Sequence, residues 1–179
     1  MKNFILSILI IAAATSYSHA QTEKGSIQLE TGFTSFVEGL QRAPNTGFSL
    51  FSLDGTTLWS IGAEGGYFIE DNFALKAGVG YTDFDGSGSF SYKIGAKYYA
   101  GGVAPFQLDL TGATIEDIET GFGDFDSPDP LYLGLQGGYA IFLADNISFE
   151  PSLRYNISLN DDFSDEGIFE LRFGFVIFL

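Results

Sequence analysis

Apolar and polar residues alternate without a break over residues 147–159, ISFEPSLRYNISL. Every second residue from Ile147 to Leu159 is apolar or aromatic, and the residues between them are Ser, Glu, Arg or Asn. A period of two predicts a β-strand whose two faces meet different surroundings. The segment is also longer than the usual strand of about five or six residues. Pro151 lacks an N–H donor, so we expect a bulge or a missing ladder bond near it.

The same alternation recurs in seven other segments. Together the predicted strands span residues 27–37, 59–69, 73–81, 90–98, 106–110, 131–143, 147–159 and 169–179. Tight turns are expected at 70–72 and 144–146 and a modest turn at 100–103, whereas the connections 38–57, 83–88, 111–130 and 160–167 are polar and generally longer. Short turns at one end and longer loops at the other predict an all-β, eight-stranded antiparallel up-and-down barrel. Its closure requires residues 28–36 to lie beside residues 170–178.

The two faces of these strands differ in side-chain size. One face carries Leu, Ile, Phe and Tyr, and the other carries mostly Gly, Ser and Ala with a few charges. Small side chains suit the interior of an eight-stranded barrel, which side chains alone can fill. The large apolar face would then meet lipid, which predicts a transmembrane β-barrel; the alternative is a soluble sheet with ordinary surface charge. Alternate residues of a strand face opposite sides, so position along the strand assigns each residue a face, and we call this assignment parity. Parity predicts the outward residues Leu75, Val79, Ile94, Leu133, Leu153 and Phe173.

Parity also places charged side chains inside the predicted barrel. The inward bases are Lys76, Lys93, Lys97, Arg154 and Arg172, and the inward acids are Glu30, Glu64, Asp109, Glu150 and Glu170. A poorly hydrated interior requires such a balance, because a lone buried charge is costly. We expect Arg154 to reach Glu150, Glu30 or Glu170, and Glu30 to pair with Arg172.

The first twenty residues, MKNFILSILIIAAATSYSHA, differ from the rest of the chain. Lys2 precedes an apolar run from Phe4 to Ala14, and Ser18 and Ala20 supply small residues at the cleavage-site positions. This pattern predicts a secretory signal peptide over residues 1–20, followed by the barrel domain over residues 21–179. A membrane anchor is disfavoured, because spanning a bilayer takes about 20 apolar residues. The chain has no Cys, which excludes disulfides and a lipid-linked Cys.

The chain is strongly acidic, with 8 Lys and Arg, one of them Lys2, against 23 Asp and Glu. A nucleic-acid partner is not expected, because phosphate binding requires a basic surface. Besides the base Arg42, the predicted loops contain Glu38, Asp54, Asp83, Asp85, Glu116, Asp117, Glu119, Asp124, Asp126, Asp129, Asp161, Asp162, Asp165 and Glu166. Exposure of these loops to water explains their many acidic residues without a bound ligand. Residues 83–88 match a calcium loop only in part, because a full loop needs more ligands and a distal bidentate Glu.

The last eight residues, RFGFVIFL, place Arg172, Gly174, Ile177 and Leu179 in a distinctive order. With the barrel pattern of residues 21–179, this ending resembles the small outer-membrane barrels of Gram-negative bacteria, the OmpX/OmpA-like β-barrel family. In that family a polar residue, a Gly two residues later and alternating hydrophobic residues form the assembly signal, usually with a final Phe where this chain has Leu179. The resemblance implies insertion by the outer-membrane assembly machinery through the C-terminal strand, and a location in the outer membrane.

Residues suited to catalysis are scarce. The only His is His19, inside the predicted signal peptide, and Cys is absent, so Ser–His and Cys–His nucleophiles are unavailable to the mature chain. Glu150 and Glu170 could serve as acid and base only in principle, and eight strands leave no aqueous channel. We predict no catalytic, cofactor-binding or metal-binding residues. We expect a non-enzymatic monomer in outer-membrane lipid, with a structural role or an extracellular partner at its loops. A barrel that binds a small ligand or cation, or a lipid-modifying enzyme, is the alternative.

Overall fold

The computed structural model describes residues 22–34, 47–53, 56–84, 86–115, 118–120, 123–125, 129–162 and 167–179. Within these ranges every regular element is a β-strand. The same ranges contain no helix with the length and apolar character needed to cross a membrane. The predicted signal peptide, residues 1–20, lies outside the described residues.

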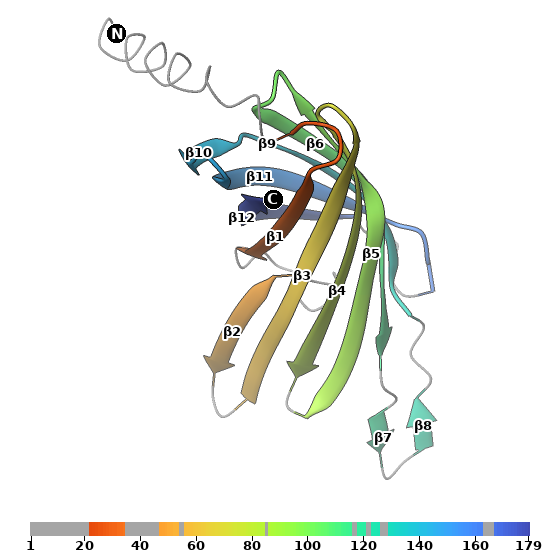
Figure 1. Cartoon of the computed structure of the whole chain (residues 1–179). Coiled ribbons are helices and arrows are strands. Elements are labelled where there is room, and N and C mark those ends of the chain that lie inside the picture. Colours follow the sequence, from red (N-terminus) through yellow and green to blue (C-terminus); the bar gives the residue numbers. More distant parts are fainter. Residues whose placement is uncertain are drawn as a thin grey trace, which may run out of the picture.

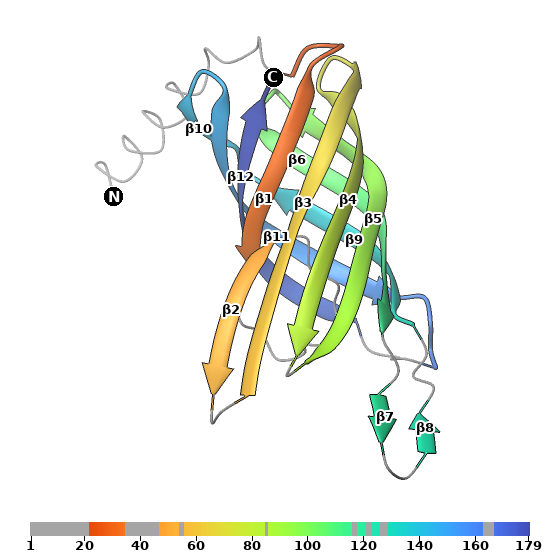
Figure 2. The ribbon, with the colours of Figure 1, turned by 60° about the horizontal axis from the view of Figure 1, so that its bottom comes forward.

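The described residues form the strands β1 (Ile27–Thr34), β2 (Phe48–Leu53), β3 (Thr56–Glu70), β4 (Phe73–Phe84), β5 (Ser87–Ala100), β6 (Ala104–Ile115), β7 (Ile118–Thr120), β8 (Gly123–Phe125), β9 (Leu131–Gly138), β10 (Ile141–Ala144), β11 (Ile147–Ser158) and β12 (Ile168–Phe178). All except β7 and β8, which pair with each other in a separate two-stranded sheet, form one closed wall (Figures 1 and 2). The main sheet runs β1-β12-β11-β9-β6-β5-β4-β3-β2, with β10 on β11, and β1 also pairs with β3. This last pairing closes a ring of eight strands, β1-β12-β11-β9-β6-β5-β4-β3, which confirms the predicted eight-stranded antiparallel barrel. The short strands β2 and β10 pair with β3 and β11 outside this ring.

The first and last strands of the barrel pair as predicted. The antiparallel register between β1 and β12 runs from Gln28 opposite Phe178 to Thr34 opposite Arg172. At the end of this seam, the amides of Ile27 and Leu179 each donate a hydrogen bond to the carbonyl of the other, at 2.9 and 2.8 Å. The seam therefore extends to the last residue of the chain.

The outward and inward faces also follow parity. Leu75, Val79, Ile94 and Leu153 are between 50% and 64% exposed, whereas Leu133 and Phe173 lie half-buried at outward positions. Large apolar side chains are exposed on β1, β3, β4, β5, β6, β9, β11 and β12. We call this continuous outer surface the apolar belt, and we call the interior of the barrel the lumen.

The two ends of the barrel differ (Figure 2). The β3–β4, β5–β6 and β10–β11 turns lie at the end where the chain terminates, which we call the short-turn end. The β2–β3 hairpin, the β4–β5 hairpin and the small β7–β8 hairpin lie at the opposite end, which we call the loop end. The predicted segregation of short turns from most of the longer connections is therefore present, although β4 extends to Phe84 and β5 begins at Ser87, so the expected connection 83–88 belongs largely to strands.

Two of the short turns repeat one arrangement. The carbonyl of Asn72 accepts a hydrogen bond from the amide of Tyr99 at 2.8 Å, and the carbonyl of Asn146 accepts one from the amide of Phe178 at 2.9 Å. The turns differ in backbone conformation, because Asn72 has a φ of 63° and is the only non-Gly residue with positive φ among the described residues. Asn tolerates this left-handed region better than most residues.

The segment before β1 is fastened to the β3–β4 turn. The hydroxyl of Thr22, which is buried, donates to Oδ1 of Asn72 at 2.6 Å, and its carbonyl accepts from the Asn72 amide at 2.6 Å. The ammonium of Lys24 lies 2.8 Å from Oε1 of Glu70, and this hydrogen bond raises the pKa of Lys24. The chain thus crosses the short-turn end before it enters the wall.

Besides the connection 83–88, three sequence-based boundaries are wrong. Residues 38–57 were expected as a connection, but β2 lies within them and pairs with β3 from Phe48–Ile61 to Leu53–Thr56. Phe48 and Leu50 are exposed and alternate with Ser49, a short apolar pattern that favours a strand once β3 offers an edge. The strand expected at 106–110 extends over β6 to Ile115, so part of the connection 111–130 belongs to the wall.

The strand expected at 131–143 is broken into β9 and β10, and Pro151 explains the break. The Tyr139 amide donates to the Pro151 carbonyl at 3.1 Å, whereas the Ala140 amide donates to Val103 at 2.7 Å. The N–H that Pro lacks would lie on the same strand edge as that carbonyl. Accordingly β11 pairs with β9 from Ser152 onward and with β10 only up to Phe149. The predicted missing ladder bond is confirmed.

Candidate functional site: the charged lumen

All ten charged residues assigned inward by parity face the lumen. Nine of them are buried, and Glu170 is half-buried. Each has at least one oppositely charged partner within 4 Å. The balance of five bases and five acids predicted from the sequence is therefore realised as contacts, and no member of this set is a stranded charge.

Toward the short-turn end, two lysines are held between three glutamates. Nζ of Lys76 lies 2.6 Å from Oε2 of Glu30 and 2.8 Å from Oε2 of Glu64. Nζ of Lys97 lies 2.8 Å from Oε2 of Glu30 and 2.5 Å from Oε2 of Glu150. Glu30 is thus shared by two ammonium groups, which links β1, β4, β5 and β11 across the barrel.

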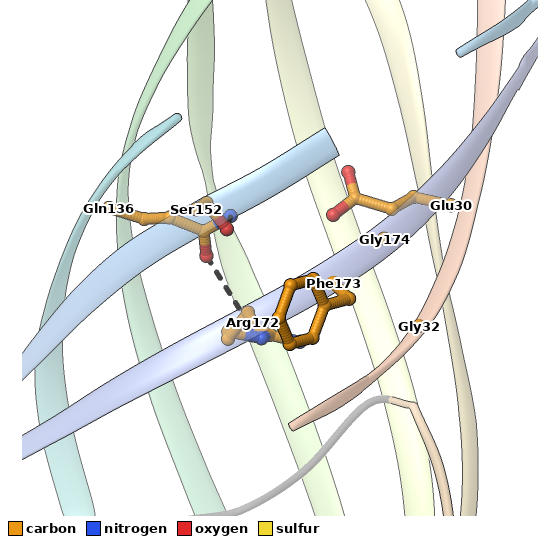
Figure 3. Close-up of a pocket in the computed structure, with 7 residues that line it drawn as sticks. All are labelled: Glu30, Gly32, Gln136, Ser152, Arg172, Phe173 and Gly174. Atoms are coloured by element: carbon orange, nitrogen blue, oxygen red, sulfur yellow. Dashed lines mark hydrogen bonds between the residues drawn. The ribbon is translucent and has the colours of Figure 1, made fainter. Parts of the chain in front are cut away.

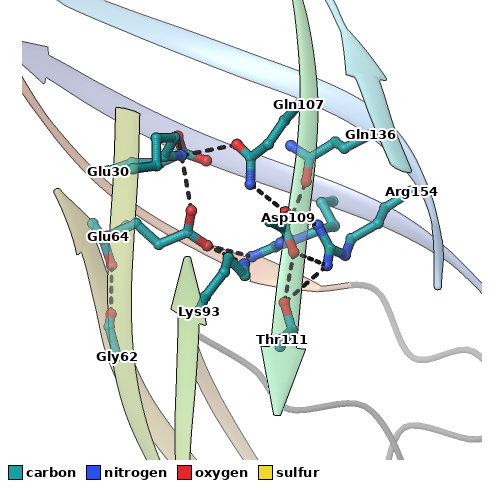
Figure 4. Close-up of polar contacts among 12 residues, drawn as sticks. Glu30, Gly62, Glu64, Lys93, Gln107, Asp109, Thr111, Gln136 and Arg154 are labelled. Carbon is teal, nitrogen blue, oxygen red and sulfur yellow. Dashed lines mark hydrogen bonds and ion pairs between the residues drawn. The ribbon is translucent and has the colours of Figure 1, made fainter. Parts of the chain in front are cut away.

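Glu64, on β3, is the second shared carboxylate (Figure 4). Besides Lys76 it binds Lys93, and a guanidinium nitrogen of Arg172 lies 3.8 Å from its Oε1. Arg172 also donates to Oε1 of Gln136 at 3.4 Å. The network therefore reaches β12, next to the seam that closes the barrel.

A bidentate pair joins Arg154 on β11 to Asp109 on β6 (Figure 4). Both terminal guanidinium nitrogens donate to Asp109 oxygens at 2.7 Å, a bidentate geometry. Nε of Arg154 donates to Oδ1 of Asn156 at 2.7 Å, and the same nitrogen lies 3.8 Å from Oε2 of Glu170. The hydroxyl of Thr111 donates to Asp109 at 2.6 Å. Both ions thus have several polar partners, as buried ions require.

Gly134 makes this pair possible. It lies on β9, between Asp109 of β6 and Asn156 of β11 in the strand register. A Cβ at this position would stand 1.9 Å from one guanidinium nitrogen of Arg154. The guanidinium therefore lies directly over Gly134 on its way to Asp109, and any side chain there would occupy its path.

Gln107 connects the two parts of the network. Its amide oxygen accepts a hydrogen bond from Lys76 at 2.9 Å, and its amide nitrogen donates to Oδ2 of Asp109 at 2.7 Å. One neutral side chain can serve both charges because an amide carries an acceptor and donors at the same end. The charged lumen is therefore one continuous polar network.

The predicted pairings within this set are correct only in part. Arg154 does reach Glu170, but its main partner is Asp109, which was assigned inward without being named as a partner. Glu30 pairs with Lys76 and Lys97 rather than with Arg172. Parity fixes which side chains share the lumen, but pairing also depends on strand register and on the position of Gly134, which alternation does not reveal.

An aromatic cluster, not anticipated from the sequence, fills the short-turn end of the lumen. Phe68, Tyr99 and Phe178 are at most 3% exposed, and their ring centroids are 6.0 to 6.3 Å apart. The Tyr99 hydroxyl lies 2.9 Å from Oε1 of Gln28 and 3.0 Å from Oε1 of Glu150, two acceptors that share its single proton, which joins the cluster to the charges. We call these three residues the aromatic plug. The sequence does contain a signal for this cluster, because all three residues occupy inward positions near the ends of their strands.

Comparison with solved structures supports this architecture. The N-terminal β-barrel domain of Pseudomonas aeruginosa OprF is similar with a TM-score of 0.54 and 15% identity, over 87% of this chain and 98% of that one. The chain has the fold of an outer-membrane β-barrel. Two other similar structures are the Yersinia pestis outer membrane protein Ail (TM-score 0.48, 14% identity, 87% and 100% covered) and Neisserial surface protein A (0.39, 19%, 85% and 95%). No protein-family model and no curated protein sequence matches the chain.

A small polar cavity in the lumen lies beside the seam (Figure 3). Glu30, Gln136, Ser152 and Arg172 contribute to its lining, and its volume is about 10 Å³. A space of this size accommodates about one water molecule. This cavity can hydrate the guanidinium of Arg172, but it is too small for an organic ligand.

The acidic residues predicted in the loops are described only in part. Asp83, Glu119 and Asp124 belong to strands, and Asp129, Asp161 and Asp162 lie outside them. The other eight acids (Glu38, Asp54, Asp85, Glu116, Asp117, Asp126, Asp165 and Glu166) and Arg42 lie outside the described residues. Asp83 pairs with Gly88 across the β4–β5 hairpin. The described residues contain no group of three or more His, Cys, Asp or Glu arranged to hold a metal ion.

Proposed function

We propose that the chain is an integral outer-membrane protein whose filled lumen makes it a scaffold for its loops rather than a pore or an enzyme. The observation that carries this proposal is the combination of an apolar outer belt with a charge-balanced interior. This arrangement reverses the usual distribution of a soluble protein, in which charged residues are almost never fully buried. In lipid, the belt is solvated and the closed sheet leaves no unpaired edge.

The size of the exposed apolar surface supports a membrane location. Ile94 and Ile61 are 64% and 57% exposed, and similar side chains surround the barrel. Soluble monomers rarely expose contiguous apolar patches beyond a few hundred Å². In this proposal the short-turn end faces the periplasm and the loop end faces outward, as in other outer-membrane barrels. The predicted signal peptide, cut after Ala20, would direct the chain to that compartment.

The filled lumen argues against a diffusion pore and against a ligand-binding barrel. The aromatic plug closes the short-turn end, and the charge network crosses the lumen behind it. The cavity beside Arg172 holds about one water, which gives a small ligand no space there. The absence of Cys, and of His beyond His19, supports a non-enzymatic role.

The remaining surface for a specific role is the loop end. Connections carry much of the binding function in proteins built on rigid scaffolds. The sequence places fourteen acids in its predicted loops, so an extracellular partner there would present basic groups or bridging divalent cations. The barrel would hold these loops at the cell surface as a monomer, inserted by the assembly machinery through β12.

Fractionation with a heat-shift assay tests the proposal. The full-length gene is expressed in a Gram-negative host, and outer-membrane and periplasmic fractions are run on SDS gels with and without boiling. We expect the protein in the outer-membrane fraction, with a shift in mobility on boiling, because a closed barrel resists SDS until heated. Recovery as a soluble periplasmic protein without a shift contradicts the membrane assignment.

Planar-bilayer recording tests the filled lumen separately. We expect no steady ion conductance from the purified protein, because the aromatic plug and the paired charges leave no continuous water path. A porin reconstituted in the same lipid gives the positive control. A steady conductance from the folded, heat-shifting protein would overturn the scaffold role while leaving the membrane location intact.

A further inference from the structure

Part of the apolar belt described by the structure is hollowed. The hollow lies over β5, β6 and β9, with Phe73 of β4 at its edge, in the short-turn half of the barrel, and its volume is about 640 Å³. Small-molecule sites typically occupy roughly 300–1,000 Å³. Its lining includes the rings of Tyr98 and Phe106 and the side chains of Leu108 and Leu135. The surface there is thus concave and almost wholly apolar.

The strand register shows how the hollow is built. Tyr98, Phe106 and Gly137 form one row across neighbouring strands, and Ala96, Leu108 and Leu135 form the next row toward the loop end. Each row therefore contains one small residue beside larger ones. Gly137 and Ala96 lie at diagonally opposite corners of these two rows. The outer surface is low at these corners, because the neighbouring aromatic and leucine side chains project farther from the wall.

The position of Gly137 is open rather than closely packed. A Cβ there would meet only the Phe106 ring, at 3.6 Å, which is ordinary contact. The inward Gly134, by comparison, leaves room for Arg154. Within 4 Å of a Cβ at Gly137 the described residues place only the Phe106 ring, so a molecule from outside the barrel can approach the position.

We propose that this hollow holds an acyl chain of a phospholipid from the periplasmic leaflet. The proposal rests on the proposed membrane location, and the continuity of the hollow with the apolar belt carries it. The hollow lies in the half that ends in short turns, which face the periplasm in barrels of this kind. Tyr98 lies near its short-turn edge, where an aromatic ring with a hydroxyl suits the boundary between chains and headgroups.

The shape favours a lipid chain over a second copy of the barrel. A second copy would present a rigid, convex outer wall, which cannot follow the two separate low corners at Ala96 and Gly137. A flexible hydrocarbon chain can lie between the projecting side chains and contact the floor at Ala96 and Gly137. Burying such a chain removes apolar area on both surfaces at roughly 25 cal/mol per Å² relative to water, but in a bilayer the gain comes from closer packing.

Filling the floor tests the site. The parent, Gly137→Leu and the matched control Gly65→Leu are reconstituted in nanodiscs of phosphatidylethanolamine and released into native mass spectrometry. Gly65 also faces outward, and a Cβ there would meet only Leu29, at 4.0 Å. We expect a one-lipid adduct on the parent and on Gly65→Leu, and its loss from Gly137→Leu. An adduct retained equally by all three overturns the site, and a dimer mass lost only in Gly137→Leu assigns the hollow to a second copy instead.

A second pair of variants tests whether loss of the adduct comes from filling the hollow or from an effect specific to replacing Gly137. Ala96→Phe fills the other corner of the floor, and Ala77→Phe adds the same ring at an outward position on β4. We expect the adduct to be lost only in Ala96→Phe. Every variant is first checked for a heat shift. A parent protein that is soluble and has no shift contradicts the membrane proposal itself, whereas heat-shifting proteins with equal adducts contradict only the lipid site.

Discussion

At the residue scale, the pair between Arg154 and Asp109 shows how one missing side chain organises a buried charge. The two side chains are 2% and 0% exposed, so each ion has lost its hydration. The bidentate geometry and the additional bonds to Asn156 and Thr111 compensate for that loss. The guanidinium can take this position because Gly134 leaves it room.

Removing the Arg154 charge should destabilise the barrel. Arg154→Met keeps much of the side-chain volume but leaves Asp109 buried without its principal counter-ion. The typical cost of breaking a buried pair in this way is about 3–5 kcal/mol. We expect the unfolding free energy in detergent micelles, measured by urea titration, to fall by an amount of that order.

The double variant Arg154→Met with Asp109→Leu shows whether the loss of stability comes from the stranded Asp109 charge or from the altered packing at position 154. We expect it to recover part of the loss, because neither charge is then stranded. Lys24→Met is the control, since its pair with Glu70 is solvated, with 61% and 69% of the side chains exposed, and it should leave the unfolding free energy unchanged. Equal stability of all these variants would mean that the lumen charges are hydrated and that a water path exists.

Gly134 should tolerate no side chain. Gly134→Val would place atoms where the Arg154 guanidinium lies, so we expect a loss of stability comparable with that of Arg154→Met. When Gly134→Val is combined with Arg154→Met it should add little further loss, because the clash and the broken pair share one cause. Gly65→Val, at an open outward position, serves as the control for glycine replacement in a strand. Full additivity of the two lumen variants would contradict this account.

At the element scale, alternation predicts a strand well only where a strand has two unlike faces. It located most of β3, β4, β5, β11 and β12 and assigned every lumen charge to the correct face, because the barrel wall separates outward from interior positions. It missed β2, whose apolar residues acquire strand structure by pairing with β3. It ran through the β9–β10 break, because that break is imposed from the neighbouring strand by Pro151.

The β3–β4 turn gives a prediction at this scale. Asn72 has a φ of 63°, and a residue with a Cβ in this region typically costs about 1–2 kcal/mol that Gly avoids. Asn72→Ala should therefore be less stable than Asn72→Gly by an amount of that order, although both lose the bond from Thr22. Thermal unfolding in micelles provides the comparison.

The corresponding turn at Asn146 supplies the matched control. Asn146 has no positive φ, yet its carbonyl accepts the same kind of bond from the next strand, here from Phe178. Asn146→Ala keeps that carbonyl, so it should be tolerated, and Asn146→Gly should bring no advantage over it. If Ala and Gly rank alike at position 72, backbone strain does not determine the choice of Asn there.

At the scale of the whole molecule, the belt, the charge network and the aromatic plug all depend on closure. Glu30 on β1 binds lysines on β4 and β5, and Arg172 on β12 reaches Glu64 on β3. These contacts cross the lumen and exist only when the seam between β1 and β12 is formed. The sequence predicted the seam from strand number alone, but not which contacts hold its two sides together.

Disulfide trapping tests that closure directly. Leu29 and Ile177 are register partners across the seam and are both exposed. They belong to a hydrogen-bonded pair, with Cα atoms about 5.5 Å apart, which lies within the range of about 4.4–6.8 Å for disulfides. The chain has no Cys of its own. Leu29→Cys with Ile177→Cys should therefore cross-link almost completely in the folded, membrane-inserted protein under mild oxidation.

The control pair is Leu29→Cys with Leu153→Cys. Leu153 is exposed on β11, which β12 separates from β1, so its Cα lies beyond the reach of a disulfide. We expect no cross-link there, and none for either pair after boiling in SDS before oxidation, because the unfolded chain does not hold the strands together. Equal oxidation of both pairs would indicate a mobile, open edge at β1. The lumen contacts of Glu30 and Arg172 could not then persist, and the barrel would lose the closure on which a lipid environment depends.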